Sequence, residues 1–103
     1  MYKLNYFVPV DAKEKTKQAL FDIGVGRYEN YECCSFETLG VGQFKPVKNA
    51  NPHIGEVDKI EKVQEYKVEM ICSDNLIKDA IAVLKEAHPY EEVAYEVFKI
   101  EDF

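Results

Sequence analysis

One short run of the sequence, His88-Pro89-Tyr90-Glu91-Glu92, combines side chains that often act in binding or catalysis. A histidine beside carboxylates can be held in one tautomer, titrate near neutral pH or ligate a divalent cation. Neighbouring residues at the start of a strand point to opposite sides, so we expect one glutamate to share a site with His88. Glu69, on the polar face of an expected strand, is the third candidate. The predicted metal set is therefore His88 with Glu91 or Glu69, and copper or zinc would suit it.

The same run also has a purely structural interpretation, which the sequence leaves open. It follows an expected helix, and a cation at a helix C-terminus is favoured by about 0.3–1 kcal/mol. His88 can supply that charge, Pro89 can set the turn, and Tyr90 can pack against the core. A catalytic cysteine–histidine pair is a further alternative, but nothing in the sequence brings a cysteine near a histidine.

Two helices and four strands must position this run. Apolar residues alternate with polar ones over residues 2–10, 62–72 and 92–100, which predicts strands, and the aromatic-rich residues 31–39 predict another. Helical spacing predicts helices over residues 12–23 and from about 74 to 87 or 88. We expect Asp11 to cap the first helix, with Glu14 three residues later, and Gly24 to end it. Ser73 or Asp74 should cap the second helix, which Pro89 prevents from continuing.

The resulting order, β-α-β-β-α-β, predicts an α+β fold of the ferredoxin-like type. The two helices should cover one face of a four-stranded antiparallel sheet. The other face should carry Phe7, Val97 or Phe98 and several charges. A face of such mixed character must be solvated or covered by another subunit.

A long connection rich in glycine and proline spans residues 40–61. Connections of this length in a small domain are uncommon and tend to be functional. One interpretation is a flap, anchored by Phe44 and Ile54, that lines a pocket or reaches a neighbouring subunit. The other is an extended, twisted hairpin arm whose glycines serve the bends. Gly40-Val41-Gly42 lacks the following helix and the Gly-Lys-Ser/Thr that a phosphate-binding loop requires.

Composition limits the classes of function. A chain of 103 residues fits one domain, residues 1–103, and its net charge of −6 disfavours binding to nucleic acid. We find no apolar run of about 20 residues that would span a bilayer and no apolar core of a signal peptide. Cys33, Cys34 and Cys72 form no C-x-x-C and are odd in number, so we expect free, buried or half-buried thiols. These features predict a cytoplasmic protein with no membrane or nucleic-acid partner.

Several of these residues together resemble a known family. The run from His88 to Tyr95 resembles the HPYEE-x-AY signature of the YqfO-like module, the CutA-like domain inserted in many proteins of the dinuclear-metal-centre (GTP cyclohydrolase type 2-like) family. A second stretch resembles that module's G-x-G-x-F-x-P…A-x-P-x-x-G pattern through Gly40–Pro46, Ala50–Pro52 and Ile54-Gly55. Three further matches are Glu65 with Glu69, Phe7-Val8-Pro9, and Gly24 with Gly26. The resemblance covers essentially the whole chain.

The resemblance implies a stand-alone CutA-like domain related to the PII signalling proteins, which assemble as trimers. It does not carry over a hydrolase activity, because a dinuclear centre needs more ligands than two histidines can supply. We therefore expect a non-enzymatic, homo-oligomeric binding or regulatory protein, with a subunit-interface site formed by Phe44, His88, Tyr90 and Glu91. The alternatives are a copper- or zinc-binding protein and, lastly, a small metal-dependent hydrolase of nucleotides.

Overall fold

The elements follow one another in the predicted order along the chain. The computed structural model describes residues 1–103 and contains strands β1 (Tyr2–Pro9), β2 (Phe36–Phe44), β3 (Glu61–Cys72) and β4 (Tyr95–Lys99). The helices are a short 3-10 turn (Val10–Ala12), α1 (Lys13–Asp22) and α2 (Ile77–Ala87). The strands form one antiparallel sheet in the order β2-β3-β1-β4. The predicted ferredoxin-like fold is thus confirmed.

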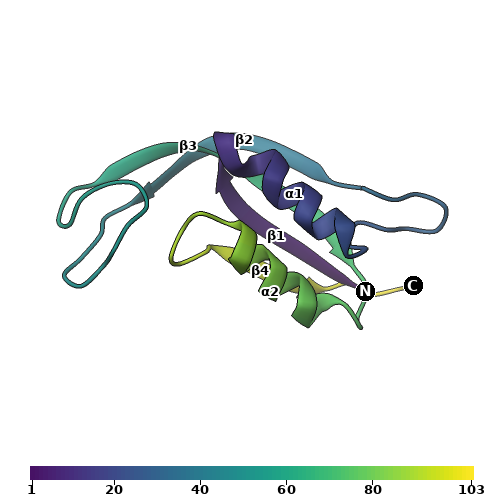
Figure 1. Ribbon diagram of the computed structural model, residues 1–103. Helices are drawn as coiled ribbons and strands as arrows, with labels where there is room; N and C mark the ends of the chain where they lie inside the picture. The colour runs from purple at the N-terminus through teal and green to yellow at the C-terminus, as the bar shows by residue number, and fades with distance from the viewer.

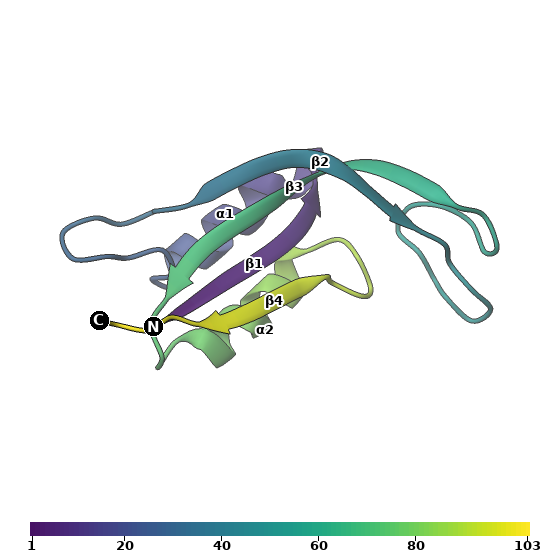
Figure 2. The ribbon, with the colours of Figure 1, turned by 180° about the vertical axis from the view of Figure 1, so that it is seen from behind.

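Both helices cover the same face of the sheet and leave the opposite face bare (Figures 1 and 2). Leu4, Tyr6 and Val8 of the central strand β1 point towards the helices and are fully buried. Each large apolar side chain buried in this way contributes about 1.5–3 kcal/mol. The other core residues come from β3, from the two helices and from the turn that follows α1: Val68, Met70, Cys72, Leu20, Ala80, Leu84 and Val25.

The bare face, which we call the open face, follows from the same alternation. The register places Asn5 of β1 between Glu69 of β3 and Glu96 of β4, and places Phe36 opposite Glu69. Phe98 lies opposite Lys3, on the same side as Asn5, whereas Val97 lies on the helix side opposite Leu4. Of the two alternatives predicted for this mixed face, Val97 or Phe98, the structure selects Phe98.

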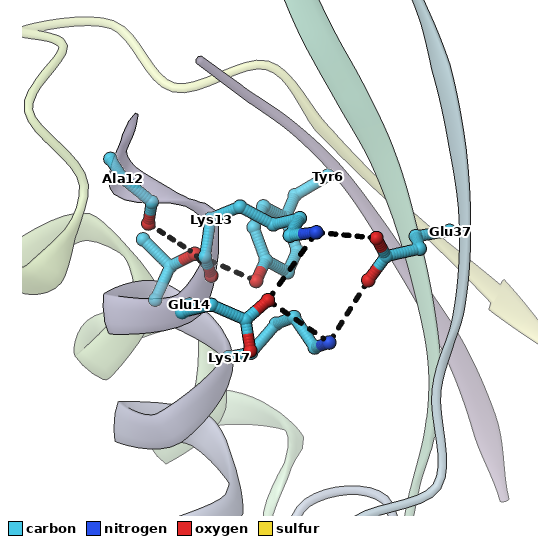
Figure 3. A network of polar contacts seen from close by, with 7 residues as sticks. Tyr6, Ala12, Lys13, Glu14, Lys17 and Glu37 are labelled. Atoms are coloured by element: carbon cyan, nitrogen blue, oxygen red, sulfur yellow. Dashed lines mark hydrogen bonds and ion pairs between the residues drawn. The ribbon is translucent and has the colours of Figure 1, made fainter. Parts of the chain in front are cut away.

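A polar cluster ties α1 to the edge strand β2 (Figure 3). Glu37 accepts hydrogen bonds from Lys13 Nζ at 2.5 Å and from Lys17 Nζ at 2.9 Å. These two lysines, Lys13 first, lower the pKa of the Glu37 carboxyl. Beneath them the buried Tyr6 hydroxyl lies 2.9 Å from Thr16 Oγ1, and burial raises the pKa of Tyr6 to about 12.

The predicted helix caps are wrong. Neither helix has a side-chain hydrogen bond at its N-cap, which is Ala12 for α1 and Leu76 for α2. Asp11 lies inside the 3-10 turn, and Asp74 instead pairs with the N-terminal ammonium of Met1. The 3-10 turn separates Asp11 from the start of α1, and the N-terminal ammonium takes Asp74 as its partner instead of α2. Gly24, with φ +100°, follows α1 as predicted.

The second strand begins five residues later than predicted. Residues 28–35 form a loop in which Tyr28 and Tyr31 bridge and Cys33 takes φ +59°. Pairing with β3 then continues through both glycines of 40–44 to Phe44. Cys33 is exposed, against our expectation, while Cys34 is half-buried and Cys72 is buried.

The long β2–β3 hairpin extends beyond the two helices and ends in a connection of residues 45–60, here called the arm (Figures 1 and 2). The loop between α2 and β4, residues 88–94, points to the same end of the molecule. We call this loop the turn. No helix has both the length and the apolar character needed to cross a membrane.

Candidate functional site

A pocket of about 440 Å³ lies between the arm and the turn. Volumes of about 300–1,000 Å³ are usual for small-molecule sites. Its wall is formed by residues of β1, β2, β3, the arm and the turn, and none comes from β4. The main contributors are Phe7 of β1, Gly42 and Phe44 of β2, Glu65 of β3, Ile54 of the arm, and Tyr90 of the turn.

Tyr90 contacts several of the residues that form this pocket. Its hydroxyl donates a hydrogen bond to Glu65 Oε2 at 3.1 Å. Its ring packs at centroid distances of 4.9 Å from His88, 6.1 Å from Phe44 and 6.3 Å from His53. Burial, followed by the adjacent Glu65 charge, raises the pKa of the Tyr90 phenol. The phenol therefore stays protonated and acts as a fixed donor and an apolar wall.

Gly42 makes room for the Glu65 carboxylate. A Cβ atom placed at Gly42 would lie 2.6 Å from Cδ of Glu65 and closer still to Oε1. The backbone of Gly42 has no positive φ, so the requirement for glycine is steric. Gly40, two residues earlier on the same strand, has nothing within 4 Å of its Cβ position.

His88 holds Tyr90 from behind the pocket. Its side chain is only 5% exposed, and Nε2 donates to the Phe7 carbonyl of β1 at 2.7 Å. Nδ1 accepts the Tyr90 backbone N–H at 3.1 Å. These two contacts require the neutral tautomer with its proton on Nε2. Burial lowers the pKa of His88, in keeping with a neutral ring.

Glu91 connects the turn to the arm. Its Oε2 accepts the backbone N–H of Asn51 at 2.8 Å. Glu92 also lines the pocket and is exposed. Together with the Tyr90 contacts, the Glu91 hydrogen bond fixes the arm against the turn. The two segments are far apart in the sequence, so only the tertiary fold brings them together.

The structure unites most of the ligand-binding residues predicted from the sequence. Phe44, Tyr90 and Glu91 line the pocket, and His88 lies one layer behind it. Sequence reasoning placed the site in residues 40–55 and the turn, which include Gly42 and His53 without naming them, and it missed Glu65. The polar alternation of β3 put Glu65 on the same face as Glu69, but only the register reveals which of the two reaches Tyr90.

The predicted metal ligands are not brought together. Glu69 faces Asn5 and Phe36, outside the pocket that Glu91 lines. Both ring nitrogens of His88 are engaged by backbone groups, so neither offers a free lone pair. No group of three His, Cys, Asp or Glu side chains is arranged to hold a metal ion.

Comparison with solved structures defines the class of this protein. CutA1 from Pyrococcus horikoshii superposes with a TM-score of 0.73 at 17% identity, over 100% of this chain and 86% of that one. The PII-like protein CutA from Nostoc sp. PCC 7120 gives a TM-score of 0.71 at 16% identity, over 98% and 82% of the two chains. This chain therefore has the CutA/PII-like variant of the ferredoxin-like fold.

The sequence comparisons then identify the relatives. The GTP cyclohydrolase 1 type 2 homolog of Bacillus subtilis is 38% identical over 99 residues, which are 96% of this chain and 26% of that protein. A homolog of the same name from Staphylococcus aureus is 40% identical over 96% of this chain and 27% of its own length. A Bacillus cereus protein related to NIF3 superposes with a TM-score of 0.84 at 36% identity, over 98% of this chain and 26% of that one.

The chain thus spans about a quarter of the curated relatives that it matches. No family model matches it. The resemblance predicted from the signature motifs is confirmed: this chain has a CutA-like fold and is homologous to a segment that makes up about a quarter of the length of proteins named GTP cyclohydrolase 1 type 2 homolog.

Proposed function

We propose that this chain is a non-enzymatic, oligomeric binding module whose ligand occupies the pocket between the arm and the turn. The observation that carries the proposal is the pocket itself. It is preformed, largely apolar, of small-molecule size, and lined by residues from β1, β2, β3, the arm and the turn. Binding there would affect the contact between the arm and the turn, which is made by Tyr90 with His53 and by Glu91 with Asn51.

The hydrogen bonds of His88 and Tyr90 argue against an acid–base or nucleophilic role for these two residues of the turn. A general base needs a free lone pair near the substrate, and both nitrogens of His88 are occupied. The Tyr90 phenol has a raised pKa and donates to Glu65, so it is a poor nucleophile or base. We place the module in the cytoplasm, where its free cysteines would remain reduced.

The open face supports self-association. Phe36 and Phe98 on this face are 65% and 53% exposed, and both edges of the sheet, β2 and β4, are unpaired. Between them Asn5 is 5% exposed, and its Oδ1 has no hydrogen-bond partner. That oxygen is already covered by atoms of this chain, so the support for self-association comes from the exposed phenylalanines and the unpaired sheet edges. We propose a trimer, the state that the family resemblance implies.

A fragment screen tests the pocket. Adding neutral and charged aromatic fragments to ¹⁵N-labelled protein should shift amide resonances of residues 42–54 and 90–94. Ala94→Tyr fills the pocket and should abolish these shifts, whereas Ala82→Tyr, on the exposed side of α2, should retain them. Shifts spread evenly over the surface, or unchanged in Ala94→Tyr, would refute the pocket as the binding site.

Light scattering at micromolar concentration tests the assembly. We expect three times the chain mass of 11.9 kDa. Phe36→Glu combined with Phe98→Glu should reduce it, because two charges would enter the proposed apolar contact. A wild-type mass equal to one chain would contradict the oligomer and leave the pocket to be judged by the fragment screen.

A further inference from the structure

Negative charge dominates the lining of the pocket. Glu65, Glu91 and Glu92 contribute three carboxylates, and Lys45 is the one lysine or arginine in the wall. The whole chain also carries a formal charge of −6. An anionic ligand would be repelled by the wall and by the net charge of the protein, whereas a cation would be attracted by both.

The carboxylates also retain acceptor capacity. Tyr90 occupies only Oε2 of Glu65, whose Oε1 lies over Gly42, and Asn51 occupies only Oε2 of Glu91. An ionised carboxylate accepts hydrogen bonds at both oxygens. Each of these two groups can therefore receive an N–H from a ligand without releasing its protein partner.

The rest of the wall fits an apolar body. Phe44 and Tyr90 present tilted rings, and Pro46, Pro52 and Ile54 of the arm add aliphatic surface. Aromatic ring faces attract ammonium and guanidinium groups as well as apolar ones. Walls of this type beside carboxylates select ligands that have both an apolar body and a cationic head.

We propose that the pocket binds a small organic cation, a protonated amine or amidinium carried on an aromatic or aliphatic body. This inference rests on the proposed function of the pocket and specifies its ligand class. The cationic head lies among Glu65, Glu91 and Glu92, and the body packs on Phe44 and Tyr90. Phosphorylated and carboxylated ligands of the same size are rejected by charge.

Three probes of nearly identical shape test the ligand class by isothermal titration at pH 7 and low salt. They are phenethylammonium, 2-phenylethanol and phenylacetate, which differ in charge. We expect phenethylammonium to bind at least about fivefold more tightly than the alcohol, and phenylacetate not to saturate. Raising the salt concentration should weaken binding of the cation and leave that of the alcohol unchanged.

Variants that each remove one negative charge show which carboxylates attract the cation. Glu92→Gln and Glu65→Gln should each weaken the binding of phenethylammonium about three- to fivefold, within the range that solvent-accessible ion pairs support. Glu65→Gln keeps an oxygen to accept the Tyr90 hydroxyl, so the wall is retained. Neither variant should change the affinity for 2-phenylethanol. Glu86→Gln, exposed on α2 and outside the pocket, removes the same charge and should change neither affinity.

The outcomes separate this inference from the proposed function. If the three probes bind equally, or phenylacetate binds most tightly, the proposal of a cationic ligand is wrong, but binding in the pocket is retained. An equal loss in Glu86→Gln and Glu92→Gln assigns the preference to net charge and overturns the site. No saturable binding of any probe also overturns the class, and the proposed function is then decided by the fragment screen alone.

Discussion

Replacing Gly42 with alanine tests the arrangement at the centre of the pocket. The new methyl group would occupy the position of the Glu65 carboxylate, 2.6 Å from Cδ. Because the Glu65 side chain is flexible at its end, it should rotate away rather than strain the strand. The consequence is loss of the hydrogen bond that the Tyr90 hydroxyl donates to Glu65 Oε2.

Two opposing effects set the change in the free energy of unfolding that Gly42→Ala should cause. A hydrogen bond to a charged group contributes about 1.5–3 kcal/mol, and the half-buried position of Glu65 places this one at the low end. Replacing glycine by alanine in a compatible backbone stabilises by about 0.4–1 kcal/mol through the unfolded chain. Gly42→Ala should therefore destabilise by about 1 kcal/mol. Gly40→Ala, with open space at its Cβ position, should instead stabilise by about 0.4–1 kcal/mol.

Urea unfolding followed by circular dichroism measures both variants at one protein concentration, since the stability of an assembly depends on concentration. The two alanine variants should differ by about 1–2 kcal/mol, and each kcal/mol moves the Tm of a domain of this size by about 4–8 °C. In a Tyr90→Phe background the hydrogen bond is already absent. Gly42→Ala should then behave like Gly40→Ala, which gives a coupling energy of about 1–2 kcal/mol.

Two results would refute this reasoning. If Gly40→Ala and Gly42→Ala change the free energy of unfolding equally, the steric role of Gly42 is wrong. If Gly42→Ala and Tyr90→Phe are additive, the two residues do not act through the same Glu65 contact.

Three further perturbations test other parts of the structure. Burial lowers the pKa of His88 below the value of about 6.5 in the unfolded chain, so the unfolded state binds more protons as the pH falls below that value. Stability should therefore be highest above about pH 6.5 and decline below it. His88→Gln should flatten this part of the urea-derived profile, whereas His53→Gln should retain most of it, because burial lowers the pKa of His88 more than the His53 charge does. Glu37→Gln removes the ion pairs to α1 and should lower the Tm by a few degrees in low salt, a difference that should shrink as salt rises; an unchanged difference would argue against an ionic contribution. Asp11→Ala should alter the free energy of unfolding by less than about 0.5 kcal/mol, because Asp11 caps no helix, and a loss near the usual 1 kcal/mol would restore the capping interpretation.

The sequence predicted the sheet and its helix-covered face because burial imposes a period on each element. Leu4, Tyr6 and Val8 had to lie on one side of a strand, and their partners in β3 had to do the same. Helix starts were less predictable. Asp74 has the side chain of a cap, yet it pairs with the chain terminus, which no local pattern reveals.

The second strand shows why a hairpin resists prediction from local residues. Glycines are unfavourable in strands, so residues 40–44 indicated a loop. In the folded protein, pairing with β3 carries the strand through both glycines to Phe44. At Gly42 the missing side chain leaves room for the Glu65 carboxylate, a contact that depends on cross-strand register.

The sequence by itself determined the order of elements, the family relationship and three residues of the pocket wall, Phe44, Tyr90 and Glu91. Periodicity and signature motifs are local properties, so one chain suffices to read them. The tertiary structure decided the roles of these residues. It placed the carbonyl of Phe7 on His88, 81 positions away, and Glu65 beneath Tyr90. Those pairings arise from strand register and hairpin length, and they make His88, predicted as a metal- or ligand-binding residue, a support behind the pocket wall.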